Sequence, residues 1–326
     1  MKKQVFFAPA LAMFLALGAC SNEDNLPQTV DLNTPIDLSF GLGAETKVAI
    51  ENPTAFDTDD AVGVYLATSD DNTQAAINAG EAVNNVQFTK TSDGWSGAIY
   101  WQNTAQYHTL YGYYPYDAAL TGTQTSKSVT VAADQHTGNG AAYKAADYLW
   151  GVNNPVKATT SSQTMQLKHQ MARVVINLSA GTDMTDQEID EMAANLKMLA
   201  SSGKNIPTEG TFEVTTGTIT ANAGNVSTLT EVTPYRTGGS RQYTYYAILL
   251  PGTEFTQGEA FVRLTDTDGT PYLYNLSTGS DLQLLAGKEY IFTLKANKAG
   301  ISLDQFTIKG WEQGSSTSGD LDIDIQ

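Results

Sequence analysis

Residues 243–250 read Tyr-Thr-Tyr-Tyr-Ala-Ile-Leu-Leu, and this stretch has apolar side chains on both faces of an extended chain. A strand with one face in solvent alternates between apolar and polar residues, whereas a strand that is covered on both faces does not. We therefore predict that residues 243–250 form a strand in the interior of a sheet.

Shorter runs that alternate between apolar and polar residues lie on both sides of this stretch. They are residues 36–40, 48–50, 62–66, 86–88, 95–101, 129–131, 149–152, 165–171, 174–178, 212–214, 261–264, 272–276, 290–294 and 306–308. Turn residues separate them, as at Asn52-Pro53, Asp93-Gly94 and Gly138-Asn139-Gly140. This pattern is typical of β-sandwiches, so the chain is predicted to be all-β. Residues 165–178 are predicted as one long strand whose alternation changes phase near Ala172.

A single short helix interrupts the predicted strands. Thr185 and Glu188 have the spacing of a capping box, and Ile189, Met192 and Leu196 then fall on one helical face. The helix is predicted to end near Asn195, with a strand after it. The small polar stretch 157–164 predicts a domain boundary. The expected parts are a signal peptide at 1–19, a flexible tether at 20–35, sandwich domains at 36–160 and 161–313, and a tail at 314–326.

The charge balance argues against a nucleic-acid partner. The chain has 18 Lys and Arg residues against 35 Asp and Glu residues, a net charge of -17, and its few cations are scattered. Phosphate binding needs a basic patch. The three histidines lie too far apart for a zinc site, and no nucleophile elbow or phosphate loop is present. We therefore expect no catalytic residues, no metal site and no cofactor.

Two other features have alternative interpretations. Asp266-Thr267-Asp268-Gly269-Thr270 starts like a calcium loop, but no glutamate follows at the twelfth position, so a hairpin turn is the better interpretation. The aromatic residues between Tyr107 and Tyr116 could stack on sugars, although their alternation with apolar neighbours favours the core.

The N-terminus has the layout of a secretory signal. Lys2 and Lys3 precede an apolar run from Val5 to Leu17, and small residues follow. Cys20 is the only cysteine, so it cannot form an intramolecular disulfide. The stretch Leu17-Gly18-Ala19-Cys20 resembles the lipobox of bacterial lipoproteins, which are cut between residues such as Ala19 and Cys20 and acylated on the cysteine, palmitate being one such acyl group. A plain secretory signal with an idle thiol is the alternative.

Several motifs, taken in order along the chain, resemble those of the fimbrillin family, the type V pilins and related surface lipoproteins of Bacteroidales bacteria. They are Gly94-Trp95, Ile99-Tyr100-Trp101, Tyr111-Gly112-Tyr113-Tyr114-Pro115, Asp147-Tyr148-Leu149-Trp150, the run from Leu167 to Val174, Ala286-Gly287-Lys288-Glu289-Tyr290, and Ile308 to Trp311 with Gly314. Glu23 and Asp24, just after the cysteine, also resemble the signal that sends such lipoproteins to the outer face of the outer membrane. An ordinary polar linker is the alternative there.

The resemblance implies two tandem transthyretin-like β-sandwich domains and assembly by strand exchange. In this family a protease removes the first strand of a subunit, and a strand of the next subunit fills the groove. The strand removed would be the one that carries Ile36, Leu38 and Phe40. The family cut usually follows an arginine, but the first arginine here is Arg173, so the cut is expected between Lys47 and Val48 or does not occur.

The C-terminal tail is the expected donor strand. Residues 314–319 read as a flexible linker, and Leu321, Ile323 and Ile325 then share one face. The alternative is that the tail is the last strand of its own sandwich or a frayed end. The predicted function is a stalk or anchor subunit of a cell-surface fimbria, with other subunits and the outer membrane as partners. A non-polymerising surface lipoprotein or a tip adhesin that binds glycan or host protein is the alternative.

Overall fold

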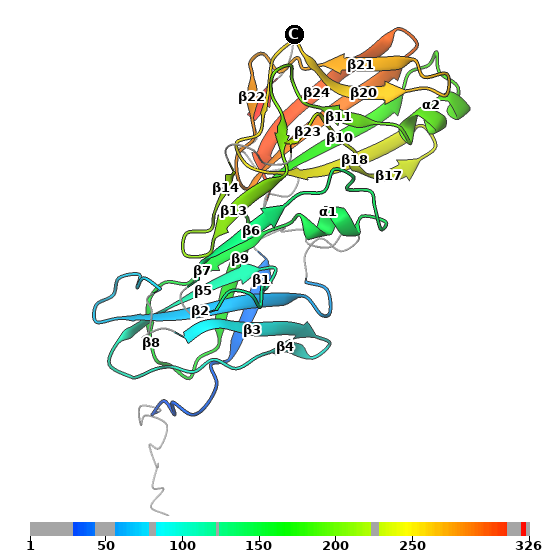
Figure 1. Ribbon diagram of the computed structural model, residues 1–326. Coiled ribbons are helices and arrows are strands. Elements are labelled where there is room, and N and C mark those ends of the chain that lie inside the picture. Colours follow the sequence, from blue (N-terminus) through cyan, green and yellow to red (C-terminus); the bar gives the residue numbers. More distant parts are fainter. Residues whose placement is uncertain are drawn as a thin grey trace, which may run out of the picture.

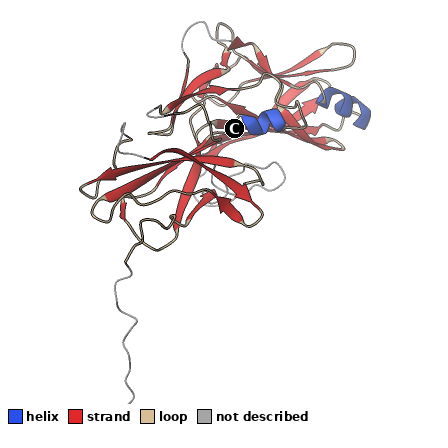
Figure 2. Ribbon diagram, turned by 60° about the horizontal axis from the view of Figure 1, so that its bottom comes forward, coloured by secondary structure: helices blue, strands red, loops and turns tan. Residues whose placement is uncertain are grey.

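A computed structural model of the chain describes residues 29–42, 56–77, 83–121, 124–222, 228–311 and 321–323. Strands make up most of this part of the chain, and helices are few (Figures 1 and 2). The all-β prediction is therefore confirmed. The domain boundaries and the transthyretin-like type of sandwich stay predictions.

The first sheet is built mainly from the N-terminal half of the chain and lies in the lower part of Figure 1. Its strands follow the order β1-β9-β7-β5-β2-β3-β4, with β8 paired to β5. Their bounds are β1 (Leu38–Leu42), β9 (Gln163–His169), β7 (Leu149–Val152), β5 (Tyr107–Tyr114), β2 (Ala61–Ser69), β3 (Val83–Thr91), β4 (Gly94–Ser96) and β8 (Val156–Lys157). The pair β1–β9 is parallel and the other pairs of this sheet are antiparallel. β1 thus lies beside a segment that comes 125 residues later in the chain.

The second sheet, in the upper part of Figure 1, has the order β17-β18-β10-β23-β24-β25. Its strands are β17 (Tyr235–Gly239), β18 (Gln242–Leu249), β10 (Ala172–Ala180), β23 (Lys288–Asn297), β24 (Gly300–Gly310) and β25 (Leu321–Ile323). β18 is bonded to β17 on one side and to β10 on the other. The prediction that residues 243–250 form an interior strand is therefore confirmed.

Smaller sheets complete the structure. A four-stranded sheet contains β16 (Glu231–Val232), β11 (Lys197–Leu199), β20 (Ala260–Thr265) and β21 (Pro271–Asn275). A three-stranded sheet contains β14 (Thr218–Ala221), β13 (Glu209–Glu213) and β6 (Ser126–Thr130), and two pairs join β12 (Ile206–Pro207) to β15 (Thr228–Leu229) and β19 (Glu254–Phe255) to β22 (Leu282–Gln283). In the chain, β6 lies between β5 and β7 of the first sheet, whereas β13 follows β10 of the second sheet, so the three-stranded sheet joins the two halves of the chain.

The prediction of one long strand over residues 165–178 is wrong. The chain forms β9 in the first sheet and β10 in the second, with a break at Gln170 and Met171. The backbone N–H of Gln170 donates to the carbonyl of Tyr148 at 2.8 Å, in register with the pairing of β9 to β7, so the chain stays bonded to the first sheet up to Gln170 and enters the second sheet at Ala172. The change of phase therefore marks a crossover between sheets.

The predicted helix is α2 (Asp186–Ala193). Its capping box is confirmed: the backbone N–H of Glu188 donates to Thr185 Oγ1 at 3.2 Å, and the backbone N–H of Thr185 donates to the Glu188 carboxylate at 2.7 Å. A second helix, α1 (Ala141–Ala145), lies in the first half, so the expectation of one helix is corrected. This five-residue helix follows Gly140 at φ 89° without a side-chain cap and buries only Tyr143, so it has no periodic signal.

Two apolar clusters fill the interior. The smaller belongs to the first sheet and includes Phe40, Val64, Phe88 and Leu167. The larger extends from the other face of that sheet, with Tyr65 and Tyr113, through the second sheet to Trp311. Burial of this kind is the main stabilising contribution in a chain whose only cysteine is Cys20.

Alkaline pH is expected to destabilise this tyrosine-rich interior. Burial raises the pKa of Tyr65 to about 12 and that of Tyr243 to about 12, and it also raises the pKa of Tyr245. An unfolded tyrosine titrates near pH 10, so between about pH 10 and 12 the unfolded chain releases protons that the folded chain keeps. The free energy of unfolding should therefore fall as the pH rises through this window.

Urea unfolding followed by circular dichroism from about pH 8 to 12 measures this fall. Tyr65→Phe should reduce the pH dependence, because phenylalanine carries no titrating hydroxyl. An unchanged urea midpoint over the whole range would contradict the prediction.

Candidate functional site

The strand β1 lies at an edge of the first sheet, where its backbone pairs with β9 (Figure 1). The register joins Leu38 to Gln163, Phe40 to Met165 and Leu42 to Leu167. An edge strand has one hydrogen-bonded neighbour in its sheet, so it can leave without breaking the sheet into two. This is the position that a removable strand needs.

The three alternating apolar residues of this segment all point into the smaller cluster. Ile36, Leu38 and Phe40 are each 6–7% exposed. The Phe40 ring makes edge-to-face contacts with Phe88 and Trp95, at centroid distances of 5.5 and 4.8 Å. Three side chains at alternate positions thus fill pockets in the core, while the residues between them face outward.

Side chains that face outward and backbone groups next to β1 add further hydrogen bonds. The backbone N–H of Ile36 donates to the carbonyl of Ile99 at 2.8 Å, and that of Gln163 donates to the carbonyl of Asp37 at 2.7 Å. Ser39 Oγ lies 3.0 Å from Thr164 Oγ1. The segment is therefore held by a backbone ladder and by apolar pockets, the two elements of recognition at a sheet edge.

The C-terminal segment is placed at the edge of the other main sheet. β25 pairs antiparallel with β24 of the same molecule, joining Leu321 to Ile308 and Ile323 to Phe306. The predicted removable strand and the predicted donor strand are therefore both edge strands, in two different sheets. The remaining predicted site residues, which are Ala19, Cys20, Lys47, Val48 and Ile325, lie outside the described residues.

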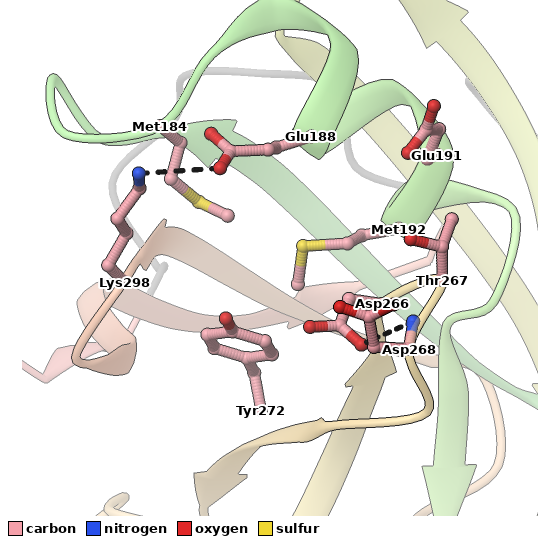
Figure 3. A pocket seen from close by; sticks show the side chains of 9 residues that line it. All are labelled: Met184, Glu188, Glu191, Met192, Asp266, Thr267, Asp268, Tyr272 and Lys298. Atoms are coloured by element: carbon pink, nitrogen blue, oxygen red, sulfur yellow. Dashed lines mark hydrogen bonds and ion pairs between the residues drawn. The ribbon is translucent and has the colours of Figure 1, made fainter.

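A pocket of about 270 Å³ lies between α2, the turn from β20 to β21 and the turn from β23 to β24 (Figure 3). Two of its carboxylates have clear structural roles. Glu188 caps α2 and lies 3.3 Å from Lys298 Nζ. Asp266 accepts from the backbone N–H groups of Asp268 and Thr270, at 3.0 and 2.8 Å. The predicted hairpin turn over Asp266–Thr270 is confirmed, and these acidic residues close a helix end and a turn.

Two of the histidines have partners that account for them structurally. Burial lowers the pKa of His108, whose Nε2 accepts the backbone N–H of Gln102 at 3.2 Å. His136 Nδ1 accepts the backbone N–H of Arg236 at 3.3 Å. Among the described residues, no group of three His, Cys, Asp or Glu side chains is arranged to hold a metal ion.

The third histidine belongs to a buried polar cluster that the sequence did not reveal. His169 Nδ1 lies 2.7 Å from Asp147 Oδ1, and both side chains are buried. The His169 ring also stacks on Trp311, with ring centroids 3.7 Å apart. His169 is therefore a packed residue of the interior, and its partners Asp147 and Trp311 come from segments that are far apart in the chain. The alternation of apolar residues around His169 and the motifs that contain these residues were the available signals, and neither shows that the residues touch.

The aromatic stretch from Tyr107 to Tyr116 is mainly part of the core. Tyr111 and Tyr113 are 3% and 0% exposed, and the Tyr113 hydroxyl donates to Asn85 Oδ1 at 2.7 Å. These rings are not available to a sugar at the surface, so the interpretation as core residues is confirmed for them. Neither described helix is both long enough and apolar enough to cross a membrane.

Comparison with known proteins gives consistent results. A family model described as fimbrillin-like matches residues 46–311. A protein of Bacteroides uniformis, described as a candidate fimbrium subunit Fim1C, is 23% identical over 324 residues, which cover 97% of each chain.

Two crystal structures share the fold. A candidate cell adhesion protein from Bacteroides uniformis has a TM-score of 0.60 at 21% identity, covering 86% of this chain and 99% of its own. A second, from Bacteroides ovatus, has a TM-score of 0.59 at 20% identity, covering 85% and 98%. At this level of identity the likeness shows a shared fold.

Proposed function

Because the chain belongs to the fimbrillin-like family, we propose that it is a structural subunit of a cell-surface fimbria that joins its neighbours by exchanging β-strands. The observation that carries this proposal is the placement of β1. It is an edge strand whose Leu38 and Phe40, together with Ile36 just before it, fill core pockets, so removal of this segment leaves an open groove with unpaired backbone groups beside β9.

The proposal also gives roles to the N-terminal residues that precede β2. Cys20 carries the lipid that attaches the precursor to the outer membrane, and cleavage between Lys47 and Val48 releases the segment that contains β1. A subunit that is not cleaved keeps its lipid and serves as the anchor. A cleaved subunit enters the stalk. The support for these steps is the sequence pattern, since these residues lie outside the described part of the chain.

The donor strand is the segment that carries Leu321, Ile323 and Ile325. Burying three aliphatic side chains contributes on the order of 5–9 kcal/mol. The cost of association reduces this to roughly micromolar affinity for a free peptide. The backbone ladder along β9 adds to the stability of a complete joint. In the monomer the same segment pairs with its own β24, so donation requires its release from that edge.

The test is a binding measurement on a protein that begins at Val48. A synthetic peptide of residues 315–326 should bind it with an affinity of about 1–100 μM, and a peptide of residues 35–42 should compete. Full-length protein, whose groove is filled by β1, is the matched control and should not bind. If the peptide of residues 35–42 binds but that of residues 315–326 does not, the groove exists but the donor assignment is wrong. Binding of neither peptide would contradict exchange at this groove.

The pairing of β25 with its own β24 favours a second candidate function, a surface lipoprotein that does not polymerise. In that case the tail completes its own sheet and the molecule acts alone, as a tip adhesin for a glycan or a host protein. Deleting residues 315–326 distinguishes the two. Loss of surface filaments supports the first function, while unchanged surface display and adhesion supports the second.

A further inference from the structure

Trp311 is the residue that directly precedes the C-terminal tail, residues 312–326. It follows the last residue of β24, and its side chain is 2% exposed. Its backbone N–H donates to the carbonyl of Gly287 at 2.8 Å, and the N–H of Gly287 donates to the carbonyl of Met171 at 2.9 Å. Trp311 is therefore linked through Gly287 to Met171, at the crossover between the two main sheets.

The Trp311 ring contacts the first sheet through His169. The two rings are nearly parallel, with an angle of 5° and centroids 3.7 Å apart. His169 is the last residue of β9, and its hydrogen bond to the buried Asp147, just before β7, fixes the orientation of the imidazole. β9 is also the strand that pairs with β1. Trp311 therefore packs against the end of the strand that borders the proposed groove.

The same ring contacts the second sheet through Arg173. The guanidinium carbon of Arg173 lies over the ring at 4.9 Å from its centroid, within the range of a cation–π interaction. Arg173 forms an ion pair with Glu289 of β23, and Lys309 Nζ of β24 lies 3.4 Å from the other oxygen of Glu289. One buried side chain thus joins the ends of β9, β10, β23 and β24.

We propose that Trp311 acts as a clasp that stops a pull on the tail from reaching β24. An antiparallel strand that is pulled from its end loses its ladder bonds one pair at a time, from Gly310 toward Gly300. The clasp must open first, and it opens only when the whole indole leaves its close-packed site. Tension therefore enters the interior strands β9 and β10 instead of peeling β24 away. The use of this clasp in a filament rests on the proposed strand exchange, in which every tail is held by a neighbour.

Single-molecule pulling on the otherwise complete chain tests the clasp. The protein starts at Ser21, which removes the native cysteine, and the handles are attached at Thr104→Cys and Gln326→Cys. Thr104 is an exposed residue of the first half. In the protein with Trp311, the first event should release residues 312–326, about 50 Å of chain at roughly 3.3–3.6 Å per residue. In Trp311→Leu, the release should continue to Gly300, about 90 Å in total, and at a lower force.

Two further variants test whether the effect is specific to the stacking of Trp311 on His169. Trp101→Leu removes a tryptophan that is equally buried, at 3% exposure, but lies in the smaller cluster, and its release length should match that of the parent protein. His169→Gln removes the stacked ring while leaving Trp311 in place, and should lower the force of the first event without reaching the value of Trp311→Leu. If Trp311→Leu fails to fold, the force of the first event in His169→Gln alone tests the clasp.

The clasp is overturned if Trp311→Leu and His169→Gln release the same length at the same force as the parent protein. This result is independent of the peptide experiment, which is done on a different molecule without load. If the clasp opens as expected while the peptide of residues 315–326 does not bind, the strand exchange fails and the clasp remains. If the peptide binds while the release lengths are equal, the clasp alone is wrong.

Discussion

Glu289→Ala is expected to lower the free energy of unfolding by about 3–5 kcal/mol, because it leaves a buried charge without its partner. Glu289 and Arg173 are 3% and 6% exposed, and their ion pair lies between β23 and β10, two interior strands of the second sheet. The carboxylate also neutralises Lys309. Its removal leaves Arg173 and Lys309 without the carboxylate that they share.

Urea unfolding, followed by tryptophan fluorescence, measures this loss. The matched control is Glu254→Ala, which breaks a 3.0 Å ion pair to Lys204 between half-exposed side chains and should cost about 0–1 kcal/mol. The double variant Arg173→Met with Glu289→Leu should recover most of the stability, since apolar residues of similar size replace a buried ion pair at little cost. A loss below about 1 kcal/mol for Glu289→Ala would show that Arg173 finds another partner or water.

The sequence was sufficient where the fold depends on local pattern. The run of apolar residues at Tyr243–Leu250 predicted an interior strand because burial on both faces removes the need for alternation, and β18 has neighbours on both sides. Thr185 and Glu188 predicted the start of α2 because a capping box is made within four residues. In both cases the pattern that predicts the structure lies within the stretch itself.

The sequence was insufficient where segments far apart meet. Nothing near Leu38 shows that β1 pairs in parallel with β9, since the partner lies 125 residues later. The apolar alternation on either side of Gln170 continues across a change of sheet, so one strand was predicted in place of two. The helix α1 buries one side chain and therefore leaves no stripe in the sequence.

For the candidate site too, the sequence predicted the local pattern but not the long-range contacts. The alternation of Ile36, Leu38 and Phe40 predicts a strand with one apolar face, but the position of that strand at a sheet edge is a property of the tertiary structure. The cluster around Trp311 was even harder to predict, because Asp147, His169 and Glu289 come from three strands or their ends. A sequence motif at each place marks the residues, and the fold alone shows that they touch.

Phe40→Ala is expected to destabilise the folded chain by about 3–5 kcal/mol, the usual cost of removing a buried phenylalanine ring. The ring is 7% exposed and contacts Phe88 and Trp95, so its loss leaves a cavity between β1 and the strands β3 and β4. Because β1 is an edge strand, much of this loss should favour local release of β1 while the rest of the sheet stays folded. Hydrogen exchange at the amides of residues 38–42 should therefore accelerate more than exchange in β18.

Peptide binding distinguishes a role of Phe40 in the core alone from a role of β1 in strand exchange. If the tail peptide of residues 315–326 and β1 compete for one groove, full-length Phe40→Ala should bind this peptide measurably, whereas the full-length parent protein should not, because the open groove is more populated in the variant. Ser39→Ala is the control, since Ser39 points outward to Thr164 Oγ1, and it should change stability by less than about 0.5 kcal/mol. If Phe40→Ala loses stability without any gain in peptide binding, the ring is a core residue only, and the groove beside β9 does not receive the donor strand.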